Sequence, residues 1–119
     1  MVGESLHLYL RPELEAMNAL YAGDYTSIYE FNRASSTHGK IKNAPANSRS
    51  RYITEDVPYL FVPFCELADI CGVEVPAAKA LVTLASIYNG EDYMNTGRTL
   101  TKIGFGHWTK QEILEFLQQ

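Results

Sequence analysis

The chain has 119 residues, of which 46% are hydrophobic and 20% charged, a balance that suits one soluble globular domain with its own apolar core. Ten basic residues stand against fourteen acidic ones, the net charge is -4 and the basic residues form no stripe, so nucleic acid is not expected as a partner. No apolar run approaches the roughly 20 residues that cross a bilayer, and residues 1–10 lack the basic start of a signal peptide, so a membrane is not expected either.

Apolar residues recur at helical spacing through most of the chain, which predicts an all-α fold. A first helix is predicted to end at Gly23, and a second to begin from a cap at Asp24. Residues 35–50 are rich in Ser, Asn, Gly, Pro and Lys, and they are predicted to form a loop. One hypothesis is that Lys40 and Lys42 in this loop attract anionic substrates.

Residues 56–71 form the most apolar segment of the chain. A helix is predicted here, capped by Thr54 or Asp56, ending at Gly72 and buried on most sides because it has little polar face. Pro63 lies inside the segment and removes one backbone hydrogen bond, so a kink or an irregular turn is predicted early in the helix.

The same segment contains Cys65 and Cys71, which are the only cysteines of the chain. They are six positions apart, which places them on different faces of a helix with about 3.6 residues per turn, so they are not expected to pair. Two buried, reduced thiols are the plainer interpretation, and a reducing cytoplasm fits it.

A further helix is predicted over residues 76–88, closed by Asn89-Gly90. Its predicted inner stripe consists of Ala77, Ala80, Leu81, Leu84, Ala85 and Tyr88. A short helix and a turn are expected within residues 92–103. We see no internal repeat and no strand pattern, so the fold class is an all-α helical bundle of about six helices.

The last helix has the clearest start signal in the chain. Thr109 and Glu112 have the spacing of a capping box, and Trp108 and Ile113 stand at the positions of a hydrophobic staple. A helix is therefore predicted from Thr109 toward the end of the sequence.

The common cofactor and catalytic motifs are missing from the sequence. It contains no GxGxxG, P-loop or HExxH, and Gly104-Phe105-Gly106 does not follow a strand. The histidines His7, His38 and His107 are scattered without the spacing of metal ligands. We therefore expect neither a metal site nor a bound cofactor from these residues.

Arg51, Glu55 and Asp56 are the candidate functional residues. In the plainer interpretation, the two acids complement a helix start, and Arg51 is solvated or pairs with one of them at the surface. In the functional interpretation, the planar guanidinium of Arg51 binds a substrate carboxylate. Asp56 would then hydrogen-bond an imidazole and stabilise its protonated form.

Residues 51–59 read RYITEDVPY and resemble the R-Y-x-T-E-D-V-P-Y block in the C-terminal domain of opine dehydrogenases, the NAD/NADP octopine/nopaline dehydrogenase family. Further similar blocks follow in order: Val62-Pro63, Ile70-Cys71-Gly72-Val73, Val75-Pro76, Gly90-Glu91-Asp92-Tyr93, Gly97-Arg98-Thr99-Leu100 and Ile103-Gly104. The resemblance covers residues 50–106, whereas residues 1–49 match loosely. Leu60-Phe61 depart from the family, which usually has a glycine before V-P.

The resemblance implies an NAD(P)H-dependent oxidoreductase that joins an amino acid to a 2-oxo acid by reductive condensation. It implies a helical domain over residues 1–119, similar to the C-terminal domain of 6-phosphogluconate dehydrogenases. NAD or NADP would bind to an N-terminal Rossmann domain, which this chain does not match. It also implies Asp56 as a catalytic residue and Arg51 as a substrate-binding residue. The family's histidine would precede Met1, so we expect the chain alone to be inactive.

Two other functional classes remain open. The chain could be a stand-alone, non-catalytic helical interaction module derived from the same fold. It could also belong to a related two-domain dehydrogenase that acts on a different 2-oxo or hydroxy acid. Under each interpretation, the isolated chain would expose an apolar face that the Rossmann domain would otherwise cover, and this face would favour a homodimer.

Overall fold

The computed structural model describes residues 1–40 and 43–118, and in these residues all regular secondary structure is helical. The all-α prediction is therefore confirmed. The chain divides into two compact units, Met1–Leu8 with Pro45–Gln119, and Tyr9–Ala44. The expectation of one domain over residues 1–119 stays a prediction. None of the helices in the described ranges has the length and apolar character needed to cross a membrane.

The unit Tyr9–Ala44 has a small aromatic core. Its elements are α2 (Glu13–Tyr21), α3 (Ile28–Ala34) and the 3-10 helix η1 (His38–Lys40). Phe31 is buried between the rings of Tyr21 and Tyr25, with ring centroids 5.3 and 5.4 Å away. Of the two loop lysines, Lys40 is exposed and Lys42 lies outside the described residues.

The predicted cap of α3 is wrong by three residues. The side chain of Ser27, not that of Asp24, accepts a backbone N–H of the first turn at 3.1 Å. The side chain of Asn18 explains the later start, because it bonds both the N–H and the carbonyl of Tyr25 at 3.0 and 2.9 Å. These two bonds keep residues 22–26 in a turn, so α3 can begin only after it.

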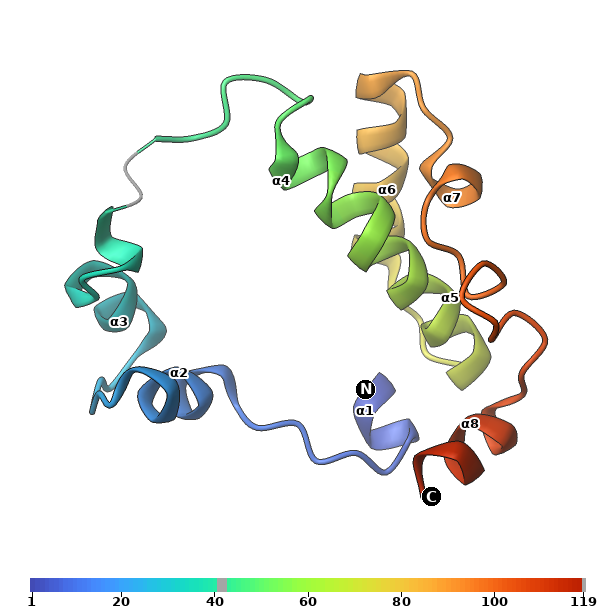
Figure 1. Ribbon diagram of the computed structural model, residues 1–119, viewed down its shortest axis with the longest axis horizontal. Coiled ribbons are helices and arrows are strands. Elements are labelled where there is room, and N and C mark those ends of the chain that lie inside the picture. Colours follow the sequence, from blue (N-terminus) through green and yellow to red (C-terminus); the bar gives the residue numbers. More distant parts are fainter. Residues whose placement is uncertain (41–42, 119) are drawn as a thin grey trace. The chain divides into compact units, whose positions relative to one another are not determined.

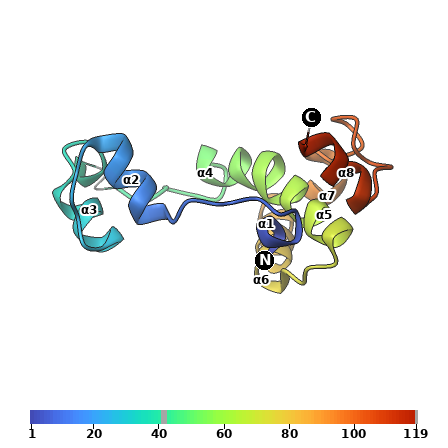
Figure 2. The same cartoon turned by 90° about the horizontal axis from the view of Figure 1, so that it is seen from below.

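The other unit contains the candidate site. Its elements are α1 (Val2–Ser5), α4 (Arg51–Thr54), the π-helical turn η2 (Val57–Phe61), α5 (Val62–Cys71), α6 (Pro76–Asn89), α7 (Tyr93–Thr96) and α8 (Lys110–Leu117). Figure 1 shows α4 and α5 as the two ends of one helical run that passes alongside α6. Both views place α1 and α8 beside the C-terminal end of α5 (Figures 1 and 2).

Two core clusters hold this unit together. The first core cluster consists of Val57, Val62, Cys65, Ala78, Val82, Ala85 and Tyr93. The second core cluster consists of Leu6, Cys71 and Ile113, with Trp108 among the side chains packed against it. Both cysteines are buried and free, as predicted, and burial raises the pKa of the Cys65 thiol.

The helical run begins earlier than predicted, so neither Thr54 nor Asp56 is its cap. The run starts at Arg51, and the N–H of Glu55 already donates to the carbonyl of Arg51 at 2.9 Å. Asp56 has helical backbone angles and makes no side-chain capping bond. A residue inside a continuous helix has no free N–H groups to cap, which is why the predicted role fails. Leu60 and Phe64 are exposed, so the run is also less buried than expected.

The irregular turn predicted from Pro63 is confirmed as η2. In this turn Val62 donates its N–H to the carbonyl of Val57, five residues earlier. The next bond in that register would need an N–H on Pro63, which has none. The carbonyl of Pro58 accepts the N–H of Arg98 instead, at 2.7 Å.

The inner face predicted for α6 is wrong except at Ala85, which is buried as predicted. The side chains that enter the core are Ala78, Val82, Ala85 and Asn89. Leu81 and Leu84 are 50% and 52% exposed, and Tyr88 is 74% exposed. Apolar residues occur on both sides of this helix, so periodicity permits two faces. The smaller side chains face the core, where α6 meets η2 and α5.

Helix ends with strong local signals are confirmed. Gly72 and Gly90 take the left-handed conformation and end α5 and α6. The capping box of α8 is present, with the Thr109 N–H donating to the Glu112 carboxylate at 2.7 Å. Trp108 packs against the cluster that holds Ile113, as the staple predicts.

Candidate functional site

The charged residues of the RYITEDVPY segment gather on one exposed side of the helical run. Arg51, Tyr52, Glu55 and Asp56 line a shallow polar depression of about 190 Å³. They converge because Glu55 follows Arg51 by four positions and Asp56 follows Tyr52 by four, and side chains at this spacing are neighbours on a helix. The structure thus brings both predicted site residues to the same depression, although no hydrogen bond joins them.

Arg51 pairs with Glu55 rather than with Asp56. Its Nη2 lies 3.0 Å from Glu55 Oε2, and its Nε lies 3.3 Å from the same oxygen. The side chains are 78% and 53% exposed, so solvent screens the pair and it contributes about 0.3–0.5 kcal/mol. Two of the five N–H groups of a guanidinium are used here, which leaves its outer edge able to bind an anion.

The Asp56 carboxylate has no hydrogen-bond or ion-pair partner among the described residues. The residue is exposed, while the next two residues, Val57 and Pro58, are buried. The backbone under the carboxylate is therefore anchored, and its oxygens face open space. Such a carboxylate can accept a hydrogen bond from an N–H donor brought in from outside the segment.

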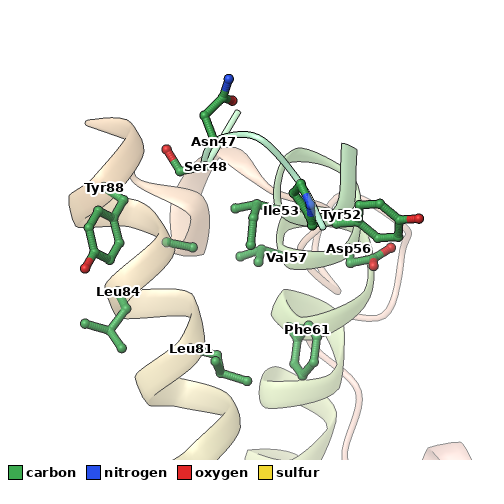
Figure 3. Close-up of a pocket in the computed structure, with 12 residues that line it drawn as sticks. Asn47, Ser48, Tyr52, Ile53, Asp56, Val57, Phe61, Leu81, Leu84 and Tyr88 are labelled. Atoms are coloured by element: carbon green, nitrogen blue, oxygen red, sulfur yellow. The ribbon is translucent and has the colours of Figure 1, made fainter. Parts of the chain in front are cut away.

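An apolar groove of about 470 Å³ adjoins the polar depression and shares Tyr52 and Asp56 with it. Figure 3 shows Ile53 and Val57 pointing across the groove toward α6, whereas Asp56 turns its carboxylate away from α6. The facing wall consists of Leu81, Leu84 and Tyr88. Sequence reasoning missed this groove because it assigned those three side chains to the core.

One end of the groove is tied by polar contacts to the end of α6. Arg49 Nη2 donates to the Asn89 carbonyl at 3.0 Å, and Asn89 Nδ2 donates to the Ser48 carbonyl at 3.0 Å. The same amide donates to the hydroxyl of Tyr93 at 2.9 Å. Asn89 is buried and joins the segment before α4 to α6 and α7. The sequence presents Asn89 only as a helix-ending residue, because its partners are distant in the chain.

The described part of the chain holds no group of three or more His, Cys, Asp or Glu side chains placed to bind a metal ion. The π-helical turn η2 follows Asp56 directly. A π-turn widens the helix by one residue and often occurs beside functional groups. The chemistry that this arrangement permits is anion binding by Arg51 and acceptance of a hydrogen bond by Asp56.

Residues 1–89 match the model of the NAD/NADP octopine/nopaline dehydrogenase family, alpha-helical domain. Vitopine synthase from Allorhizobium ampelinum is 32% identical over 97 residues, which is 82% of this chain and 27% of that protein. Protein ocs from Agrobacterium tumefaciens is 35% identical over 83 residues, 70% of this chain and 23% of that protein. Protein ocs from Agrobacterium vitis is 34% identical over 86 residues, which is 72% of this chain and 24% of that protein. The chain spans about a quarter of the length of these relatives.

Proposed function

The chain belongs to the NAD/NADP octopine/nopaline dehydrogenase family, and from this premise we propose that it is the substrate-binding and catalytic helical part of an opine dehydrogenase-type oxidoreductase. In the reaction, the amino group of an amino acid condenses with the carbonyl of a 2-oxo acid, which forms an imine and releases water. NADH or NADPH supplies the hydride that reduces this imine. The observation that carries the proposal is the exposed Asp56 carboxylate, which has no partner among the described residues and lines the same depression as the exposed guanidinium of Arg51.

The described residues do not fit the dinucleotide itself. They contain no strand with a glycine-rich turn after it, which is the arrangement that holds a pyrophosphate in this class of enzyme. We therefore assign none of them to NAD or NADP. The nucleotide-binding role goes to an N-terminal Rossmann domain, and the role of this chain is to bind and orient the substrates.

Arg51 binds a substrate carboxylate in this proposal. Its bond to Glu55 is exposed and weak, so a carboxylate can share or replace it at little cost. A bidentate guanidinium–carboxylate pair fixes the position of the anion as well as its charge. A lysine at this position would keep the charge and lose the paired geometry.

In this proposal, Asp56 orients an imidazole and stabilises its protonated form. It accepts the N–H of the histidine that the family resemblance implies, and it stabilises the imidazolium that forms when the histidine takes a proton from the amine. No histidine of this chain is assigned to that role. Two observations support Asp56: its carboxylate is free among the described residues, and the buried Val57 and Pro58 hold its backbone still.

The test is NAD(P)H oxidation with pyruvate and a panel of amino acids, using the natural protein that carries this chain. Asp56→Asn should lower kcat by about 10²–10⁴-fold, the usual contribution of a positioned acid–base pair. Asp24→Asn is the matched control, since Asp24 is exposed and lies in the other unit. An Asp56→Asn enzyme with the kcat of the natural protein would remove the proposed role.

The exposed apolar face of α6 supports a second candidate function, a non-catalytic interaction module. Leu81, Leu84, Ile87 and Tyr88 are all exposed on this helix. In our main proposal the Rossmann domain covers this face. In the alternative, a second copy of the chain covers it, and Leu84→Glu should convert a dimer to a monomer in sedimentation analysis. A wild-type chain that is monomeric at high concentration would exclude the second copy.

A further inference from the structure

Arg98 is exposed and lies next to the η2 turn. Its Cζ lies 5.1 Å from the centroid of the Tyr59 ring, in a cation–π contact, and the Tyr59 residue is 53% exposed. No carboxylate among the described residues pairs with it. Arg11 and Arg51, by contrast, each pair with a glutamate four residues later.

The backbone of Arg98 is fixed against η2. Its N–H donates to the Pro58 carbonyl at 2.7 Å, the group that Pro63 leaves without a partner. The preceding residue must be small, because a Cβ on Gly97 would lie 2.7 Å from the Pro58 oxygen and 2.6 Å from the Tyr93 oxygen. The close approach of the two backbones therefore determines where the Arg98 side chain begins.

The segment around Arg98 is held at two more points. Lys102 Nζ donates to the carbonyls of Asn95, Thr96 and Gly97 at 2.9, 2.9 and 2.8 Å. The Glu66 carboxylate accepts the N–H of Leu100. A charged side chain thus holds the backbone on each side of Arg98. Little conformational freedom is left for the backbone to lose when the guanidinium binds a ligand.

Tyr59 contacts the Arg98 guanidinium and lies close to Asp56 in the sequence. Tyr59 and Asp56 are three positions apart in the helical run, and both are exposed. The Arg98 N–H bonds the carbonyl of Pro58, and Pro58 lies between these two residues in the chain. Arg51 precedes Asp56 on this run, and Tyr59, which the Arg98 guanidinium contacts, follows it.

We propose that Arg98 is a second carboxylate-binding residue of the substrate site. The inference rests on the proposed function, because an amino acid and a 2-oxo acid each bring one carboxylate and their condensed product carries two. Arg51 binds one carboxylate and Arg98 the other, with the nitrogen between them near Asp56. The Tyr59 ring keeps the guanidinium plane in place and leaves its N–H edge for bidentate binding.

The test is an NMR titration of this chain with the opine of alanine and pyruvate, a secondary amine with two carboxylates. We expect Arg98→Gln to weaken binding by about tenfold, the loss typical of one charge-assisted contact. This variant keeps the backbone N–H that bonds Pro58. Arg33→Gln is the matched control, since Arg33 is also exposed and lies 5.8 Å from a ring centroid, that of Tyr29. It should bind like the wild type.

Separate titrations with pyruvate and with L-alanine then identify the carboxylate. Arg98 binds the carboxylate of the ligand whose affinity falls in the Arg98→Gln variant and is unchanged in the Arg51→Gln variant. If Arg51→Gln weakens opine binding and Arg98→Gln does not, the role of Arg98 is refuted and the proposed function stands. If Arg98→Gln weakens it and Arg51→Gln does not, the assignment of Arg51 fails instead. A wild-type chain that binds none of the three ligands contradicts both.

Discussion

Gly97→Ala is the substitution whose outcome the structure determines most sharply. The added Cβ would lie 2.6 Å from the Tyr93 oxygen, 2.7 Å from the Pro58 oxygen and 3.1 Å from the Pro58 Cα. All three are backbone atoms, so no side chain can turn aside to make room. The segment must move away from η2, which breaks the 2.7 Å bond from the Arg98 N–H to the Pro58 carbonyl.

The sign of the stability change shows whether an added Cβ at residue 97 clashes with the neighbouring backbone. The backbone angles of Gly97 are φ -66° and ψ -173°, which alanine also adopts. Without a clash, Gly97→Ala would stabilise the fold by about 0.4–1 kcal/mol, because it restricts the unfolded chain. With the clash, the Pro58 carbonyl loses its partner in a buried setting, at a cost of about 1–3 kcal/mol. We expect a net destabilisation of about 2 kcal/mol.

Urea unfolding followed by Trp108 fluorescence measures this change, since Trp108 is the only tryptophan and lies in the same unit. Gly72→Ala is the comparison variant. Gly72 has φ +67° and nothing within 4 Å of an added Cβ, so its cost of about 1 kcal/mol is conformational alone. A Gly97→Ala chain as stable as the wild type, or more stable, would refute the close approach of the two backbones.

Two further predictions concern α6 and α8. Val82→Ala should cost about 2 kcal/mol and Leu84→Ala less than about 1 kcal/mol in the same urea assay, because Val82 is 0% exposed and Leu84 is 52% exposed. Equal losses would contradict the observed face of α6. Bonds from the Thr109 N–H and hydroxyl lower the pKa of Glu112 below its ordinary value of 4.5. Its contribution to stability is therefore present above 4.5 and is lost as the pH falls through the lowered pKa. Hydrogen exchange of α8 should show this dependence in the wild type and lose it in Glu112→Gln.

Strong local signals in the sequence predicted three helix ends. Gly72 and Gly90 end their helices and Thr109 caps the last one, because each effect depends on residues within one turn. Pro63 likewise predicted an irregular turn, since its missing N–H is a property of the residue itself. Membership of the opine dehydrogenase family was also predicted, from the RYITEDVPY segment and the blocks after it.

Choices between two similar alternatives could not be predicted. In α6 both faces are apolar, so only the shape of the facing core selects Val82 over Leu84. The start of the central helix at Arg51 has no side-chain cap to mark it in the sequence, and the partner of the Pro58 carbonyl lies in a distant segment. The partner of Arg51 was left open between two acids, and the spacing of four residues favours Glu55. The roles of Asp56 and Arg51 in catalysis stay predictions.

The two free thiols are built-in reporters of local opening. Cys65 lies in the first core cluster and Cys71 in the second, and both are buried. A thiol reagent can reach each sulfur only when its own cluster opens, so the two labelling rates report two separate opening free energies. Because one chain carries both reporters, the unmodified protein reveals which cluster opens first. The same pair of rates would reveal whether a bound carboxylate ligand stabilises the η2 side of the unit selectively.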